Sequence, residues 1–258
     1  MQFDHIAQWL QRLLGDSPEQ LAIKLAGKYR GGERRKACQW KNGAFNVCYR
    51  VQSDSELEAI VRFSALGRSI FRAEKVDNEV VVLRFLHRHT AIPVPEVVEN
   101  GKTWTGPFIV ISYINGTPLA NILKDPNIKG RPVLDPQISD RDLQRAYYEM
   151  SKLLLALSKL EFPKIGALVE SPDGKFTVVR RPFTYSMNEL STLANVPRHV
   201  FPKTVFESAH DYFKYLASQH MLHFLLQCNG AVEDEADCRK KFTTRCLFRK
   251  LIRRTHPV

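Results

Sequence analysis

Residues 74–86 read EKVDNEVVVLRFL, in which apolar side chains recur at helical spacing among three acidic residues. The pattern predicts an amphipathic helix over residues 74–89. The apolar side chains that recur at this spacing are Val76, Val80, Leu83 and Leu86. Glu79 falls inside the same apolar arc. A carboxylate on a buried helix face stays ionised only beside a cation. We therefore expect Glu79 to pair with a cationic side chain from another element.

The cation best placed to pair with Glu79 is Arg62, in the strand-like run AIVRF of residues 59–63. Strand alternation turns Arg62 away from its immediate neighbours and onto the face of Ile60. A strand cation paired with a helix carboxylate beneath a glycine-bearing hairpin is an arrangement that holds phosphates. The same spacing also fits a purely structural ion pair, or a Glu79 side chain that escapes to solvent.

The residues around this pair predict a small mixed lobe of strands around one helix. Residues 38–52, CQWKNGAFNVCYRVQ, hold an Asn-Gly pair between strand-like runs, which predicts a hairpin. IPVPEVVENG (92–101) predicts an extended segment, and GPFIVISYI (106–114) predicts a buried strand. Gly43 in the hairpin can let backbone amides approach a phosphate, although Asn-Gly is first of all a turn signal. We expect this lobe to cover residues 1–115.

The second part of the chain, residues 116–258, is predicted to be mainly helical. Residues 124–140 hold three prolines and a glycine, which is typical of a loop. The helices predicted after it cover residues 139–160, 208–227 and 233–254. Ser139 or Asp140 can cap the first of these helices and Ser208 the second. A Pro-Asp-Gly turn at residues 172–174 predicts a hairpin between the first two helices.

Composition and charge exclude several classes of protein. The 258 residues are 44% hydrophobic and 25% charged, which are globular values. No apolar run approaches the roughly 20 residues of a membrane span. The formal charge is +11, but residues 239–258 alone carry +8, at the basic end of a helix that opens with acidic residues. Nucleic-acid binding is therefore the least favoured of the functions considered.

The five cysteines form no disulfide framework, which favours a reducing, cytoplasmic location. A zinc site is suggested superficially by four residues near the C-terminus. They are His220, His223, Cys228 and Cys238. No CxxC pair is present, and His223 falls on the apolar arc of its helix, so a packed histidine is the favoured interpretation.

Eight stretches in a fixed order point to one family. They are NGAFNVCYRV (42–51), IVRFSALGR (60–68), EKVDNEVVVLRFL (74–86), IPVPEV (92–97), FIVISYINGTPL (108–119), LSKLEFPKIGAL (157–168), DYFKYLASQHMLH (211–223) and DEADCRKKFTTRCLFRKLI (234–252). In this order they resemble the aminoglycoside phosphotransferase family, and most strongly its fungal branch. The family shares a protein-kinase-like fold with choline and fructosamine kinases. The fold class expected is α+β, with a small antiparallel-sheet N-lobe and a partial, mainly helical C-lobe.

The resemblance also implies a function and a set of binding residues. The family transfers the γ-phosphate of ATP to a hydroxyl of a small molecule, with Mg²⁺. By resemblance, residues 42–47 cover the phosphates, Arg62 stands where many relatives have a phosphate-binding lysine, and residues 111–115 form the hinge that meets adenine. The cofactor-binding residues implied are Gly43, Arg62, Glu79, Tyr113 and Ile114.

The catalytic residues of the family are not found in this sequence. Their pattern is an aspartate followed five positions later by a metal-binding asparagine, and no aspartate after residue 116 has one. We therefore expect no catalytic residue, no Mg²⁺ site and only weak ATP binding. The chain fits a C-terminally truncated enzyme, or alternatively a non-catalytic pseudokinase or binding fragment, of unknown acceptor. An apolar patch rimmed by the 139–160 helix is then expected to be uncovered, with self-association as the consequence.

Overall fold

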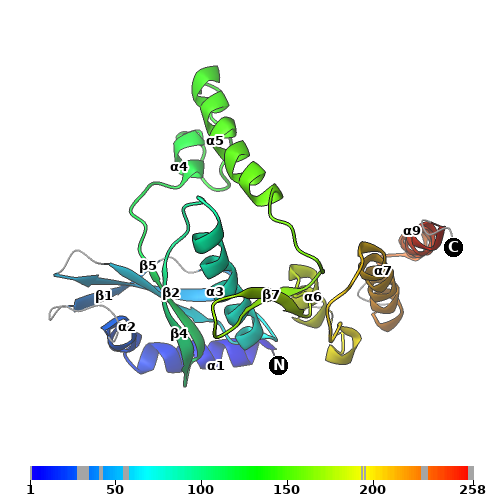
Figure 1. Cartoon of the computed structure of the whole chain (residues 1–258), viewed down its shortest axis with the longest axis horizontal. Helices are drawn as coiled ribbons and strands as arrows, with labels where there is room; N and C mark the ends of the chain where they lie inside the picture. The colour runs from blue at the N-terminus through cyan, green and yellow to red at the C-terminus, as the bar shows by residue number, and fades with distance from the viewer. Residues whose placement is uncertain are drawn as a thin grey trace.

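The computed structural model describes residues 2–27, 35–40, 43–54, 58–192, 194, 196–227 and 232–254. Its first part is a five-stranded antiparallel sheet in the order β1-β2-β3-β5-β4 (Figure 1). The strands are β1 (Arg35–Gln39), β2 (Asn46–Ser53), β3 (Ala59–Ser64), β4 (Val97–Thr103) and β5 (Gly106–Ser112). The antiparallel sheet and the hairpin of β1 and β2 agree with the sequence analysis.

One face of the sheet packs against two helices that the sequence analysis missed, α1 (Gln2–Gly15) and α2 (Pro18–Gly27). Alternate strand residues such as Tyr49 and Val61 form a core with Leu13 of α1. Trp9 adds a buried hydrogen bond, in which its indole Nε1 donates to the carbonyl of Thr105 at 2.8 Å. The signal that could have revealed α1 is the helical spacing of Trp9 and Leu13.

The other face of the sheet packs against α3 (Arg72–His89), which lies across the middle of the molecule in Figure 1. Ile60, Ile109 and Ile111 of the sheet contact Val76 and Val80 of the helix. The predicted apolar arc of this helix is therefore its sheet-facing side. We refer to this side of the sheet as the α3 face, because it carries the candidate site.

The second part of the chain is mainly helical, as expected. Its elements are α4 (Leu119–Leu123), α5 (Asp140–Ser158), the hairpin of β6 (Ala167–Glu170) and β7 (Phe176–Arg180), α6 (Tyr185–Thr192), the 3-10 helix η1 (Arg198–Val200), α7 (Ala209–Leu226) and α9 (Glu235–Arg254). α7 and α9 pack on each other, at the opposite end of the molecule from β1 (Figure 1). Among the described residues, no helix has the length and apolar composition to cross a membrane.

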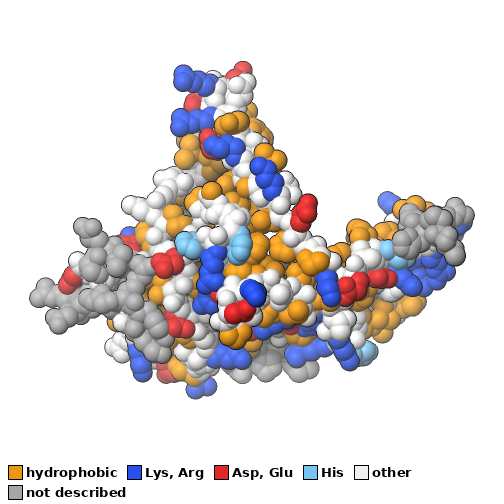
Figure 2. Space-filling model, viewed as in Figure 1, with side chains coloured by type: hydrophobic (Ala, Val, Ile, Leu, Met, Phe, Trp, Pro, Cys, Tyr) orange, Lys and Arg blue, Asp and Glu red, His pale blue; other side chains and the backbone are white. Residues whose placement is uncertain are grey.

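α5 projects away from the rest of the chain (Figure 1), and none of its residues is buried. Ser139 caps the helix by accepting a hydrogen bond from the Asp142 N–H at 3.1 Å, and Ser208 caps α7 in the same way. Hydrophobic side chains gather along the projecting helix in Figure 2. Tyr147 is 69% exposed and Leu154 is 60% exposed. An apolar surface of this kind typically marks a contact site for another molecule.

Candidate functional site

Arg62 of β3 and Glu79 of α3 form a two-point ion pair on the α3 face. Arg62 Nη1 lies 2.7 Å from Glu79 Oε1, and Arg62 Nη2 donates to Glu79 Oε2 at 3.1 Å. The side chains are 20% and 29% exposed, so the pair lies at the edge of the packed interface with solvent access on one side. The predicted pairing of these two residues is confirmed.

Two neighbours on β2 complete the surroundings of Arg62. Cys48 is its cross-strand partner in the β2–β3 register, and burial raises the pKa of the Cys48 thiol, against the opposing effect of Arg62. The side-chain oxygen of Asn46 accepts a hydrogen bond from Arg62 Nη2 at 3.1 Å in the amide orientation that suits both of its neighbours. The guanidinium is thus held from two sides, by a carboxylate and by an amide. The sequence analysis did not single out Cys48 or Asn46. Strand alternation in residues 46–53 could have placed Cys48 on this face.

Gly43 lies in the connection between β1 and β2, next to this end of the sheet. Its N–H donates to the carbonyl of Asn46 at 3.1 Å. A Cβ atom added at Gly43 would meet no atom within 4 Å, and the backbone there does not have a positive φ. The fold itself therefore does not require a glycine at this position. Asn42, the other residue of the predicted turn, lies outside the described residues.

Tyr113 and Ile114 directly follow β5, and Tyr113 packs against the apolar cluster of the α3 face. The Tyr113 N–H donates to the Glu58 carbonyl at 3.0 Å, and Ile114 is 59% exposed. In the β3–β5 register Arg62 is opposite Ile109, so Tyr113 follows four residues further along the strand direction, about 13 Å away. The structure brings Arg62 and Glu79 into contact and places Tyr113 along the same face, whereas Ile114, the next residue, is mostly exposed.

An aromatic and cationic cluster surrounds Tyr113, and the sequence analysis missed it. The Arg50 guanidinium lies 4.0 Å from the Tyr113 ring centroid and 5.2 Å from that of Trp40, and the two rings meet edge to face at 5.7 Å. Arg50 Nε donates to Glu58 Oε2 at 2.6 Å. Burial disfavours the charged form of Glu58, but hydrogen bonds from Gln52 and Arg50 outweigh it and lower the pKa of Glu58. Arg50 therefore faces a charged carboxylate at neutral pH.

A cavity of 380 Å³ adjoins Glu79 on the side of α6. It is lined by Phe45, Lys75, Asn78, Glu79, Val82, Leu83, Phe183, Thr184, Tyr185 and Asn188. Asn188 fixes α6 against the loop before α3: it accepts a hydrogen bond from the Ile70 N–H at 3.3 Å and donates to the Arg68 carbonyl at 3.0 Å. Lys75 lies with its Nζ 4.3 Å from the centroid of the Phe45 ring.

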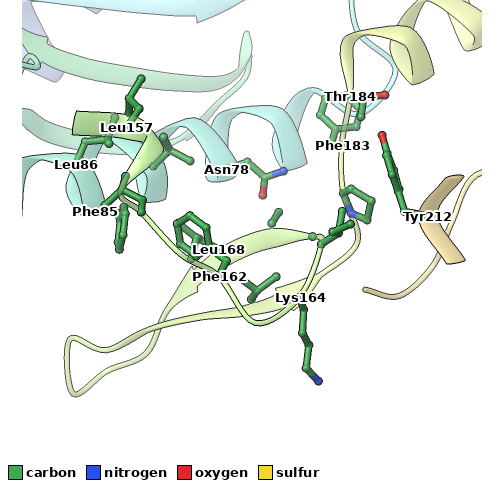
Figure 3. Close-up of a pocket in the computed structure, with 17 residues that line it drawn as sticks. Asn78, Phe85, Leu86, Leu157, Phe162, Lys164, Leu168, Phe183, Thr184 and Tyr212 are labelled. Carbon is green, nitrogen blue, oxygen red and sulfur yellow. The ribbon is translucent and has the colours of Figure 1, made fainter. Parts of the chain in front are cut away.

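A second cavity, of 620 Å³, continues along α3 between this helix, the β6–β7 hairpin and α7 (Figure 3). Its walls are mostly apolar, with Phe85, Leu157 and Phe162 among them. Asn78 reaches toward it from α3, and the Asn78 Oδ1 atom is buried without a hydrogen-bond partner among the described residues. Lys164, although it borders the cavity, points away from it in Figure 3.

The described residues contain no group of three or more His, Cys, Asp or Glu side chains that could hold a metal ion. His220 and His223 lie half-buried on α7. Burial lowers the pKa of both imidazoles, and the nearby Arg245 adds to the effect. Cys238 lies at the start of α9, and Cys228 lies outside the described residues. The structure thus places the two histidines in a helix–helix contact.

The sequence model of the phosphotransferase enzyme family, APH, matches residues 37–196, which is more than half of the chain. This range contains strands β2 to β5 and α3 together with α5, the β6–β7 hairpin and α6. The chain therefore belongs to the phosphotransferase enzyme family. No curated protein is a detectable relative of this chain.

Several solved structures of kinases and phosphotransferases are similar to this chain over most of its length. The GDP and kanamycin complex of APH(2")-IIia is 11% identical and covers 89% of this chain and 97% of its own, with a TM-score of 0.28. The amicoumacin kinase hAmiN in complex with AMP-PNP, Ca²⁺ and Ami is 13% identical, covers 96% of both chains and has a TM-score of 0.31. A putative fructosamine-3-kinase from Haemophilus somnus 129PT is 13% identical, covers 92% of this chain and 96% of its own, and has a TM-score of 0.27.

Proposed function

We propose that this chain binds ATP on the α3 face of its sheet. Arg62 binds the phosphates, Glu79 orients Arg62, and the loop around Gly43 covers the phosphates. Tyr113 and Ile114 contact the adenine at the other end of the face. The observation that carries the proposal is the two-point pair of Arg62 and Glu79, in a chain that belongs to the phosphotransferase enzyme family.

The geometry of Arg62 supports a role in binding phosphate. A guanidinium carries five N–H donors in a rigid fork, and the bonds to Glu79 leave some of them free for a ligand. The two-point contact with Glu79 fixes the plane of the fork before any ligand arrives, which reduces the entropy lost on binding. The distance of about 13 Å from Arg62 to Tyr113 suits a nucleotide lying along the face, with its base at one end and its phosphates at the other.

The family's reaction is the transfer of the ATP γ-phosphate to a hydroxyl of a small molecule. Residues 116–258 contain no Asp-x4-Asn pattern to supply a base and a metal ligand. We therefore propose that this chain by itself binds ATP weakly, with little dependence on Mg²⁺, and does not transfer phosphate. On this proposal the chain acts as a binding module of the pseudokinase type.

The test is calorimetric titration of ATP with and without Mg²⁺, beside a phosphotransfer assay over a panel of aminoalcohols and sugars. We expect Arg62→Ala to abolish ATP binding and Arg141→Ala, an exposed arginine on α5, to leave it unchanged. The wild-type chain should show no turnover above the Arg62→Ala background. ATP binding that is retained in Arg62→Ala would contradict the assignment of the ATP site to the α3 face. Turnover, or an affinity that rises sharply with Mg²⁺, would contradict the non-catalytic assignment.

A further inference from the structure

Lys75 lies in the first turn of α3, four residues before Glu79, and borders the 380 Å³ cavity. Its ammonium rests on the ring of Phe45, the residue that precedes β2, at 4.3 Å from the ring centroid. The same ring meets Tyr185 of α6 edge to face, with 6.0 Å between the two ring centroids. Lys75 thus contacts the β1–β2 connection, shares a cavity with α6 and lies close enough to Arg62 and Glu79 to feel their charges.

This position is unfavourable for a cation in three ways. Burial lowers the pKa of Lys75, with Glu79 opposing the effect and Arg62 adding to it. The first turn of a helix carries partial positive charge, which disfavours a lysine there. Glu79 is one helical turn away, but both of its oxygens are bound to Arg62, and Lys75 forms no salt bridge among the described residues. A cation kept under these conditions favours a binding role over a structural one.

The charge around the cavity is therefore unbalanced. Both oxygens of Glu79 are bound to Arg62, and Lys75 adds a positive charge that no carboxylate of the described residues contacts at salt-bridge distance. The other described residues that line the cavity are uncharged. With mainly apolar walls on the remaining sides, the field of this ammonium is screened less than it would be at an open surface. The site is electrostatically complementary to an anion.

We propose that Lys75 is a second phosphate-binding cation, which together with Arg62 holds the terminal phosphates of a bound nucleotide. This inference rests on the proposed function. An ammonium is a compact point charge with three donors, suited to phosphate oxygens, whereas the Arg62 fork binds them bidentately. The ring of Phe45 positions the ammonium without neutralising it. Two cations of this kind bind polyphosphate without a metal ion.

The experiment compares Lys75→Met and Lys75→Arg with the matched control Lys102→Met, an exposed lysine on β4. Each variant is titrated with ATP, inorganic tripolyphosphate and adenosine in the absence of Mg²⁺. We expect Lys75→Met to weaken ATP and tripolyphosphate binding about tenfold or more, the effect of one charge-assisted hydrogen bond. Adenosine binding should be unchanged. Lys75→Arg should stay within about threefold of the wild type, because one charge-assisted contact is retained.

Thermal unfolding separates a binding role from a structural one. The melting temperature of Lys75→Met should equal or exceed that of the wild type, because an unpaired, half-buried charge is removed. Lys75→Met could instead have a lower melting temperature, and Lys75→Arg could restore the melting temperature but not tripolyphosphate binding. This result would mean that the contact with Phe45 is structural, and it would overturn the proposal. Unchanged tripolyphosphate binding by Lys75→Met would overturn it as well.

The proposed function can fail separately from this inference. ATP binding that depends on Arg62 but not on Lys75 overturns the role of Lys75 alone. Tripolyphosphate binding that depends on Lys75, in a chain that does not bind ATP, overturns the nucleotide site and supports the phosphate site. A chain that binds neither ligand overturns both.

Discussion

Arg181 and Glu74 join the two parts of the chain through a two-point ion pair. Arg181 Nε donates to Glu74 Oε1 at 2.8 Å, and Arg181 Nη2 donates to Glu74 Oε2 at 2.5 Å. Arg181 directly follows β7, whereas Glu74 lies in the first turn of α3. The hydrogen bonds that Arg181 donates to Glu74, against the opposing effect of burial, raise the pKa of Arg181. The helix that carries Lys75 and Glu79 is therefore anchored by the second part of the chain.

Arg181→Met should destabilise the protein by about 1–2 kcal/mol, because the two partners are only 17% and 22% exposed and Glu74 would lose its cation. The matched control is Arg180→Met. Arg180 lies 3.9 Å from Asp77 in an exposed pair, so its loss should change the free energy of unfolding by less than about 0.5 kcal/mol. Urea unfolding measures both values, and equal values for the two variants would contradict the anchoring role.

The pair of Arg62 and Glu79 should show a coupling free energy of about 1 kcal/mol in a double-mutant cycle. This value lies at the upper end for exposed pairs, because the side chains are partly buried and bonded at two points. The measurement is urea unfolding of Arg62→Ala, Glu79→Ala and the double variant. Additive effects of the two substitutions would show that the ion pair contributes no stability.

Gly43→Ala should leave folding unchanged and weaken ATP binding several-fold. The added methyl group meets no protein atom within 4 Å, so any loss of affinity would come from contact between this methyl group and the bound ATP. Gly15→Ala, at a site that is equally open, is the control and should leave both properties unchanged. Calorimetry with ATP and thermal unfolding test the two variants together. An unchanged ATP affinity for Gly43→Ala would remove this loop from the proposed site.

The exposed apolar side of α5 should drive self-association at micromolar to millimolar concentration. Burial of large side chains such as Tyr147 and Leu154 is favourable by about 25 cal/mol per Å² of apolar surface. Leu154→Glu should therefore shift the equilibrium toward the monomer, whereas Lys159→Glu, an exposed change at the end of α5, should not. Sedimentation velocity over a concentration series measures the shift. A wild-type chain that stays monomeric throughout would contradict this prediction.

The packing of α7 on α9 should weaken as the pH falls below about 6.5. His220 faces Phe248 of α9, with ring centroids 6.5 Å apart, and its pKa is lowered by burial and by Arg245. Because the pKa of His220 is lower in the folded protein, the unfolded chain binds a proton at this histidine more readily. Stability is therefore lost as the pH falls through the pKa of histidine in the unfolded chain. His223 contributes in the same direction.

The measurement is the urea midpoint at pH 7.5 and at pH 5.5. The wild-type midpoint should fall at the lower pH, and His220→Gln combined with His223→Gln should reduce this fall. Glu58 does not interfere, because its stabilising effect is lost only below the ordinary pKa of a glutamate, near 4.5. A pH dependence that is identical in the double variant would contradict the assignment to these histidines.

The ion pair of the candidate site was predictable from sequence because it depends on two local periodicities. Helical spacing placed Glu79 with Val76 and Val80, and strand alternation placed Arg62 on the face of Ile60; the structure confirms both. The caps at Ser139 and Ser208 were predictable for the same reason, since each hydrogen bond spans three residues. In contrast, α1 and α2 were missed although the helical spacing of Trp9 and Leu13 was available.

The neighbours of the pair depend instead on which elements pack together. From the sequence, Lys75 is one more polar residue of a helix. It lines a cavity because Phe45, which precedes α3 in the chain, and Tyr185, which follows it, line the same cavity. Arg181 meets Glu74 across 107 residues. Spacing within one helix or strand determines which side chains share a face, since the backbone geometry repeats. The contacts between faces follow from the packing of the whole chain, which no local pattern specifies.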